Sequence, residues 1–70
     1  MNQFTIEFDR ETDGRWIAEI SALPGALSYG SSKEDASRKV EAIALRILAD
    51  RIEGGVDVPE LAGAFIQLPA

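Results

Sequence analysis

The sequence predicts an α+β domain in which three short strands are followed by one long helix and then by a last strand. Apolar and polar residues alternate with a period of two in separate segments, which is typical of half-buried strands. Between them lies a stretch of helix-spaced apolar residues that opens on a serine cap and ends on two glycines. A chain of 70 residues makes one domain, so we expect residues 1–70 to form a single unit with the order β-β-β-α-β.

The first two strands form a predicted hairpin. In residues 4–8, two phenylalanines and an isoleucine alternate with a threonine and a glutamate, which indicates a strand with one buried face. Asp13-Gly14 supplies the turn chemistry between this strand and the next. The second strand covers about residues 15–20, where Trp16 shares a face with the next two alternate residues, an alanine and an isoleucine. This shared face favours Trp16 as a core residue over Trp16 as a binding anchor.

The third strand and the helix follow a turn signal at Pro24-Gly25. We expect a short strand at residues 26–29, which completes an antiparallel meander of three strands. Ser32 is a good N-cap for the helix because an acidic residue follows three positions later, as in a capping box. The helix is expected to run to about Glu53, before Gly54-Gly55, so that about 21 residues span ~30 Å.

The helix has two apolar faces. The face expected to pack on the sheet contains Ala36, Val40, Ile43, Ala44 and Ile47. A second apolar strip beside it is formed by Leu45, Leu48 and Ile52. We predict that this strip is a surface for self-association, which makes the protein a homo-oligomer. An equally weighted alternative is that the tail after the helix folds back over the strip through its own apolar residues, Val56, Val58 and Leu61.

The last strand is predicted at residues 64–68, where alanine, isoleucine and leucine alternate with phenylalanine and glutamine. A right-handed crossover from the helix would place this strand beside the first one and parallel to it. The face of the sheet opposite the helix would then carry a mixture of charged, polar and apolar side chains. They are Thr5, Glu7, Arg15, Ile17, Glu19, Phe65 and Gln67.

This open face is the predicted binding surface. Ile17 and Phe65 form its expected apolar centre and Glu7 and Glu19 its acidic rim, a combination that suits a basic protein partner. The net charge of −5 also permits such a partner, and it argues against binding to a nucleic-acid backbone, which needs clustered cations. The alternative is that the face is the wet side of an antiparallel sheet and that the charge only provides solubility.

The residue types that most often support catalysis are missing from the chain. It contains no cysteine and no histidine, which removes the thiolate and the imidazole as nucleophile, general base or metal ligand. Its serines therefore lack a histidine that would activate them, and no glycine-rich phosphate loop is present. We expect no catalytic residue, no bound metal and no cofactor.

A small metal-dependent nuclease is the enzymatic alternative. Glu7 and Asp9 on the first strand and Glu41 in the helix are candidate ligands for two cations, in a site similar to that of the ribonuclease H fold. Such a site also needs an acid on the last strand, which has none, because Asp57 and Glu60 come before it. The incomplete set of carboxylates disfavours nuclease chemistry.

Membrane insertion and export are not expected. The start of the chain has neither the basic region nor the apolar region of a signal peptide. The apolar run at residues 42–49 is interrupted by Arg46 and is too short to cross a bilayer. We therefore expect a cytoplasmic protein.

An ordered series of short motifs runs through residues 3–58. The series is Gly14, Trp16, Ala18, Ile20, Leu23-Pro24-Gly25-Ala26, Tyr29-Gly30, Glu34-Asp35-Ala36 and Glu41-Ala42. In this order and at these spacings, the chain resembles the N-terminal module of HicB-type antitoxins. It departs from that family at Ala26, where the family often has cysteine, and at the cap Ser31-Ser32, where the family often has an acid and a threonine.

The resemblance implies a partial ribonuclease-H-like fold, no enzymatic activity, and a partner that is a small basic RNA-cleaving toxin (HicA-like) with a double-stranded-RNA-binding-like fold. Many family members also carry a C-terminal DNA-binding domain. Residues 56–70 are too few for such a domain, so direct DNA binding is not expected. The expected function is that of an antitoxin that occludes the toxin of a type II toxin–antitoxin system. The alternative is an orphan module that assembles with itself.

Overall fold

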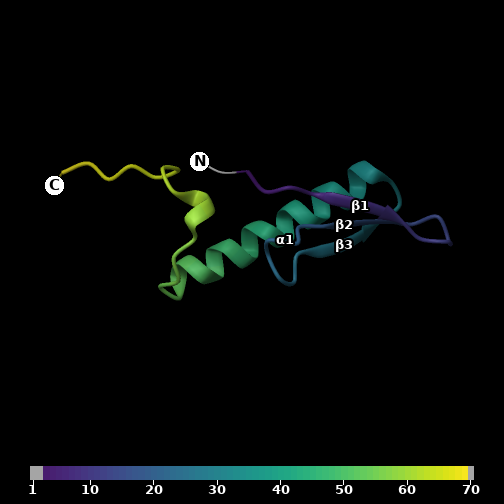
Figure 1. The fold of residues 1–70 in the computed structure, drawn as a ribbon, viewed down its shortest axis with the longest axis horizontal. Helices are drawn as coiled ribbons and strands as arrows, with labels where there is room; N and C mark the ends of the chain where they lie inside the picture. Colours follow the sequence, from purple (N-terminus) through teal and green to yellow (C-terminus); the bar gives the residue numbers. More distant parts are fainter. Residues whose placement is uncertain (1–2, 70) are drawn as a thin grey trace.

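The computed structural model describes residues 3–69 and has an α+β fold with three antiparallel strands and one long helix (Figure 1). The elements are β1 (Glu7–Arg10), β2 (Trp16–Glu19), β3 (Leu27–Gly30), α1 (Lys33–Glu53) and a short 3-10 helix, η1 (Pro59–Leu61). The strands lie in the order β1-β2-β3, and each is antiparallel to its neighbour. The predicted meander and helix are therefore confirmed. Met1, Asn2 and Ala70 of the predicted domain lie outside the described residues.

The register of the strands separates the sheet into two faces. Phe8, Ala18 and Ser28 lie side by side across the three strands, and Ala18 is fully buried. Because successive side chains on a strand point to opposite faces, the neighbouring row belongs to the other face. The row that contains Ala18 thus faces the helix, and the opposite face of the sheet is left open.

The joint between β3 and α1 sets the distance of the helix from the sheet. A Cβ atom added to Gly30 would lie 2.3 Å from the backbone nitrogen of Ala36, so no larger side chain fits there. The helix begins at the predicted cap, because the side chain of Ser32 accepts a hydrogen bond of 3.0 Å from the backbone N–H of Asp35. From this start α1 packs against β2 and β3. No helix among residues 3–69 is both long enough and apolar enough to cross a membrane.

The core lies between the helix and the sheet. Its buried residues are Ala18, Ile20, Leu23, Ala26, Ala36, Val40, Ala44 and Leu48. On the helix, the predicted core face is confirmed by three of these residues and by Ile43 and Ile47, which are partly buried against them. The prediction placed Leu48 outside this face and is wrong there, since its side chain is 5% exposed. The physical reason is the spacing of four residues that continues the stripe from Ala36 by way of Val40 and Ala44.

The predicted last strand is wrong for the chain as it folds here. Residues 64–68 form no strand, and Phe65, Ile66 and Leu68 are 78%, 83% and 83% exposed. Val58 and Leu61 pack against the core instead, and beyond η1 the chain leaves the body as an extended tail (Figure 1). Alternation of apolar and polar residues permits a strand, but a strand also needs a hydrogen-bonded neighbour.

Candidate functional site

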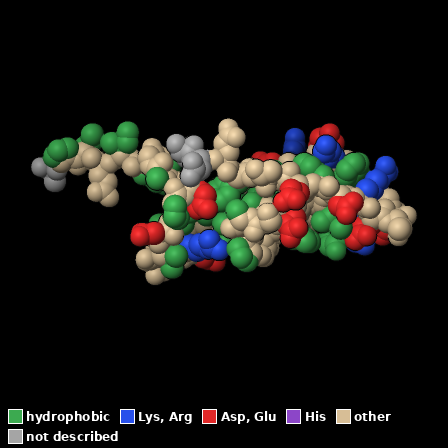
Figure 2. Space-filling view, in the orientation of Figure 1, with side chains coloured by type: hydrophobic (Ala, Val, Ile, Leu, Met, Phe, Trp, Pro, Cys, Tyr) green, Lys and Arg blue, Asp and Glu red, His purple; other side chains and the backbone are tan. Residues whose placement is uncertain are grey.

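The open face of the sheet is built from two rows of three side chains. The strand register gives the rows Glu7–Glu19–Leu27 and Asp9–Ile17–Tyr29. The carboxylates therefore lie on β1 and β2, whereas the apolar side chains lie on β2 and β3. Figure 2 shows carboxylates interspersed with hydrophobic side chains over the part of the body that contains the sheet. The open face thus has an acidic half toward the β1 edge and an apolar half toward the β3 edge.

The acidic half contains a shallow pocket. Its volume is about 230 Å³, and it is lined by Glu7, Phe8, Asp9, Ile17 and Glu19. Glu7 and Glu19 lie directly opposite each other, and Glu7 Oε1 accepts a hydrogen bond of 3.0 Å from the hydroxyl of Ser21. Three of the four partner-binding residues expected from the sequence therefore meet at one pocket, which joins negative charge to an apolar side chain.

The apolar half is centred on Tyr29 and Leu27. Each is 41% exposed, so both present apolar surface to solvent. The Arg15 guanidinium lies 4.6 Å from the centre of the Tyr29 ring, a cation–π contact that fixes the aromatic ring. Sequence reasoning did not place Leu27 and Tyr29 on this face. The signal was present in the alternation of residues 26–29, but their side depended on the pairing of β3 with β2.

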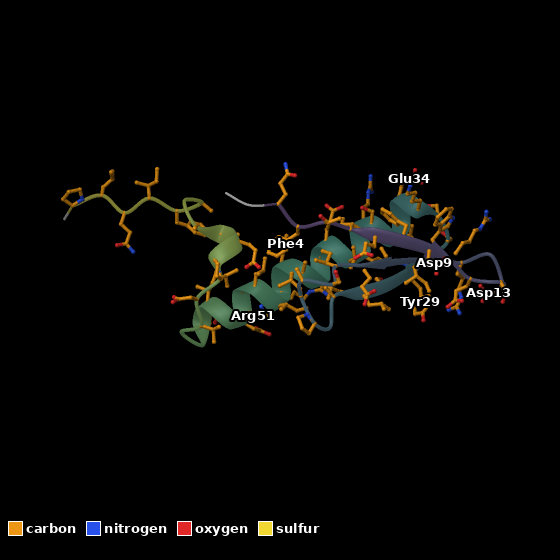
Figure 3. All side chains as sticks on the ribbon, in the orientation of Figure 1. Phe4, Asp9, Asp13, Tyr29, Glu34 and Arg51 are labelled. Carbon is orange, nitrogen blue, oxygen red and sulfur yellow. The ribbon has the colours of Figure 1, made fainter. Side chains whose placement is uncertain are left out.

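The hairpin beside this half carries an ion pair. Arg15 Nε lies 2.8 Å from Asp13 Oδ2, and the backbone N–H of Arg15 donates to Asp13 Oδ1 at 3.0 Å. The backbone hydrogen bond is the main cause that lowers the pKa of Asp13, and the guanidinium adds to the effect. Figure 3 shows Asp13 at the hairpin end of the sheet, with Asp9 and Tyr29 nearby. One side of Arg15 is therefore held by a carboxylate and the other by an aromatic ring.

The fourth predicted partner-binding residue, Phe65, lies elsewhere. It lines a pocket at the end of α1 together with Ile52, Val56 and other residues of the tail. The expectation that Phe65 joins Ile17 on the open face depended on the last strand, and this placement is wrong because that strand is absent from the sheet. The apolar neighbours of Ile17 come from β3 instead.

The predicted self-association strip is also divided. Leu45 is 68% exposed and Ile52 is 50% exposed, but Leu48 between them belongs to the core. Leu45 lines a groove shared with the residues just before β1, whereas Ile52 lines the pocket at the end of the helix. The two exposed residues therefore belong to separate surfaces. Of the residues suggested to cover the strip, Val58 and Leu61 pack on the core, and Val56 is exposed.

The carboxylates considered for a nuclease do not converge. Glu7 and Asp9 project from the open face, while Glu41 lies on the helix that covers the opposite face. Glu41 accepts a hydrogen bond of 2.8 Å from the Ser37 hydroxyl on the same helix. Within residues 3–69, no group of three or more His, Cys, Asp or Glu side chains has the arrangement of a metal site. The arrangement on the open face is suited to binding a cationic surface.

Comparisons of this chain with protein-family models, with curated proteins and with solved structures find no match.

Proposed function

We propose that this protein is a HicB-like antitoxin whose open sheet face binds and occludes a small basic RNA-cleaving toxin. The observation that carries the proposal is the pocket in which Glu7, Asp9 and Glu19 surround Ile17. The HicB-like part of the proposal rests on the resemblance of the ordered motifs from Gly14 to Glu41-Ala42 to that family. The meander followed by α1 is compatible with a partial ribonuclease-H-like fold.

The pocket offers a basic side chain both charge and apolar contact. Like charges directly opposite each other on a sheet repel, so Glu7 and Glu19 are better stabilised with a cation between them. The methylene groups of a lysine or arginine from the partner would then pack against Ile17. Leu27 and Tyr29 extend the apolar contact across the rest of the face. The carboxylates are therefore expected to set the association rate of the complex, and the apolar residues its dissociation rate.

The proposed mechanism is occlusion. The antitoxin covers the catalytic surface of the toxin, and its net charge of −5 competes with the negatively charged RNA for the same basic residues. No chemical step by the antitoxin is required. The fraction of toxin that is inhibited would therefore equal the fraction of toxin that is bound by the antitoxin.

The test of the acidic half is the association rate. The partner for this test is a basic HicA-like protein from an adjacent reading frame, where one is found, purified with its catalytic residue substituted so that it can be prepared. The double variant Glu7→Lys and Glu19→Lys is expected to slow association and to reduce its dependence on salt. The matched control is Glu53→Lys with Glu60→Lys, which makes the same change of net charge away from the open face. Equal slowing by both double variants would place the interface elsewhere.

The test of the apolar centre is the dissociation rate. Ile17→Ala is expected to weaken the complex by about 1–3 kcal/mol, mostly through faster dissociation. Circular dichroism must first show that the variant keeps the helix and sheet. A well-folded Ile17→Ala protein that binds and neutralises the toxin as well as wild type would contradict the proposal.

The test against the nuclease is direct. The protein is incubated with RNA and with an RNA–DNA hybrid in the presence of Mg²⁺ or Mn²⁺, and no cleavage is expected. Cleavage that Glu7→Gln abolishes would overturn the proposal in favour of an enzyme. The absence of a basic coding sequence beside this one, together with no bound toxin, would favour the alternative of an orphan module that assembles with itself.

A further inference from the structure

We propose that residues 64–68 of one copy of this protein pair with the outer edge of β1 in a second copy, and that the two copies exchange these tails reciprocally. The inference concerns self-assembly and does not rest on the antitoxin function. It is carried by three observations: an exposed tail with the pattern of a strand, an edge strand with a free side, and an apolar groove beside the residues that lead into that strand.

The tail, residues 64–68, has the alternating pattern of a strand but is not paired with any described strand. Ile66 and Leu68 are among its most exposed side chains, and they alternate with Phe65 and Gln67. The tail projects from the body beyond the end of α1, and Figure 2 shows hydrophobic side chains along it. Soluble proteins rarely leave such a run of large apolar side chains in water. A partner that buries the run is therefore expected.

The body has a vacant position for one more strand. β1 is at the edge of the sheet, with β2 as its hydrogen-bonded neighbour on one side and no described strand on the other. An unpaired edge presents backbone N–H and C=O groups that can pair with another chain. β1 has four residues and the tail segment has five, so the two segments match in length.

An apolar groove lies beside residues 4–6, which lead directly into β1. The helix packs mainly against β2 and β3, which leaves the side near β1 less covered. The groove there has a volume of about 320 Å³ and is lined by Phe4, Ile6, Ile20, Glu41, Ala44, Leu45 and Leu48. Six of these seven lining residues are apolar. The groove can therefore accept hydrophobic side chains from a strand laid along β1 and the residues just before it.

The two faces of the tail match the two surfaces that they would meet. Side chains two positions apart on a strand share a face, so Ile66 and Leu68 would enter the groove together. Phe65 would then point to the open face, beside the carboxylates of β1. In this arrangement Phe65 occupies the surface where sequence reasoning expected it, but it comes from the second copy.

The exchange is expected between copies because each chain holds its own tail away from its own groove. Val58 and Leu61 pack on the core and fix the start of the tail at the end of α1. From there the tail runs away from the sheet (Figure 1). If the tail of each copy binds in the groove of the other, the two contacts are equivalent and the assembly is a closed twofold dimer. Because both tails and both grooves are then occupied, the exchange would give a dimer and not a growing filament.

The first experiment is sedimentation velocity of the full chain at micromolar concentration. We expect wild type to be a dimer, and Ile66→Asp with Leu68→Asp to raise its dissociation constant by at least about 30-fold. Leu45→Asp, in the groove, should have the same effect. The control is Ile52→Asp, which introduces the same charge at an exposed helix residue outside the groove and should leave the dimer intact. All four side chains are at least half exposed, so circular dichroism should show unchanged folds.

The second experiment distinguishes exchange from other self-association. The tail variant Ile66→Asp with Leu68→Asp keeps an intact groove, and the groove variant Leu45→Asp keeps an intact tail. Mixing them restores one of the two contacts, so a heterodimer is expected where each variant alone is monomeric. A monomeric wild-type protein, a dimer that survives the tail substitutions, or failure of the mixture to associate would each overturn the proposal.

Discussion

Glu7 and Glu19 face each other across the β1–β2 pair, and the strand register leaves no oppositely charged residue between them. The hydroxyl of Ser21 donates a hydrogen bond to Glu7, but it does not neutralise either carboxylate. The isolated protein therefore keeps a repulsive pair in the acidic half of its proposed binding surface. Such an arrangement costs stability in the free protein and favours a cationic partner.

The first prediction concerns this pair. Glu19→Gln is expected to raise the free energy of unfolding by about 0.2–1 kcal/mol, because it removes one of two like charges that are directly opposite on a sheet. The gain should shrink at high salt, where the repulsion is screened. Urea unfolding at low and high salt measures both effects. Glu11→Gln, in the loop after β1, is the control, and an equal gain there would show that only net charge matters.

The second prediction concerns the joint between β3 and α1. Gly30→Ala is expected to destabilise the fold by about 1–3 kcal/mol or more, because the added Cβ would meet the backbone of Ala36 rather than a movable side chain. Gly54→Ala is the control, since the nearest atom to its Cβ would be 3.3 Å away and its φ is −80°. Thermal unfolding compares the two variants. Equal stability of both would mean that the helix can shift away from the sheet at no cost.

The third prediction concerns the start of the helix. Ser32→Ala should lower the free energy of unfolding by about 1 kcal/mol, because the hydroxyl that accepts the Asp35 N–H is lost. Ser31→Ala is a matched control. Ser31 takes part through its backbone N–H, which donates to Asp35 Oδ2 at 3.1 Å and is unchanged by the substitution. The two variants differ by one position, so chemical denaturation should separate the cap from the general effect of losing a serine.

The fourth prediction concerns acid. The side chain of Lys39 and the backbone N–H of Ser31 lower the pKa of Asp35 below its ordinary value of 3.8. A carboxyl whose pKa is lower in the folded state stabilises the fold above its unfolded pKa, and this contribution is lost as pH falls through the folded pKa. The melting temperature of wild type should therefore fall more steeply below about pH 4 than that of Asp35→Asn.

The control for this prediction is Asp57→Asn, in the segment between α1 and η1. Its acid dependence should match that of wild type, because the described residues show no hydrogen bond or ion pair to the Asp57 side chain. Melting curves of the three proteins at the same series of pH values provide the comparison. If Asp35→Asn and wild type lose stability in parallel, other carboxylates dominate the acid transition.

The helix could be predicted almost to the residue because its boundary signals are local. Ser32 with its acidic partner marks the start, and Gly54-Gly55 follows the last turn, so α1 spans Lys33–Glu53. The β2 and β3 strands lie within one residue of the predicted ends for a similar reason, since turn residues bracket them. These elements depend on interactions among residues that are close in the sequence.

The last strand and the exact contents of the open face could not be predicted in this way. The alternation at residues 64–68 is the same whether the segment is paired or projects into solvent, because pairing depends on an edge far away in the sequence. The predicted core stripe ends at Ile47 and leaves out Leu48, whereas the helix buries this residue at a spacing of four from Ala44. Tyr29 lies on the open face because β3 pairs with β2 in a register that places it opposite Ile17, and this register cannot be predicted from either strand alone.

The length of α1 compared with the strands has a consequence for local unfolding. The helix has 21 residues, or ~30 Å, whereas β2 has four residues and spans only about 13 Å. The first turns of α1 therefore pack on the sheet, and the last turns pack against Val58, Leu61 and the segment before β1. Amide hydrogens near Arg51 should exchange with solvent through opening of these last turns alone, while those near Val40 should wait for global unfolding. Tail exchange between copies would slow hydrogen exchange at the amides near Arg51. Exchange at the amides near Val40 would still depend on the stability of the whole domain.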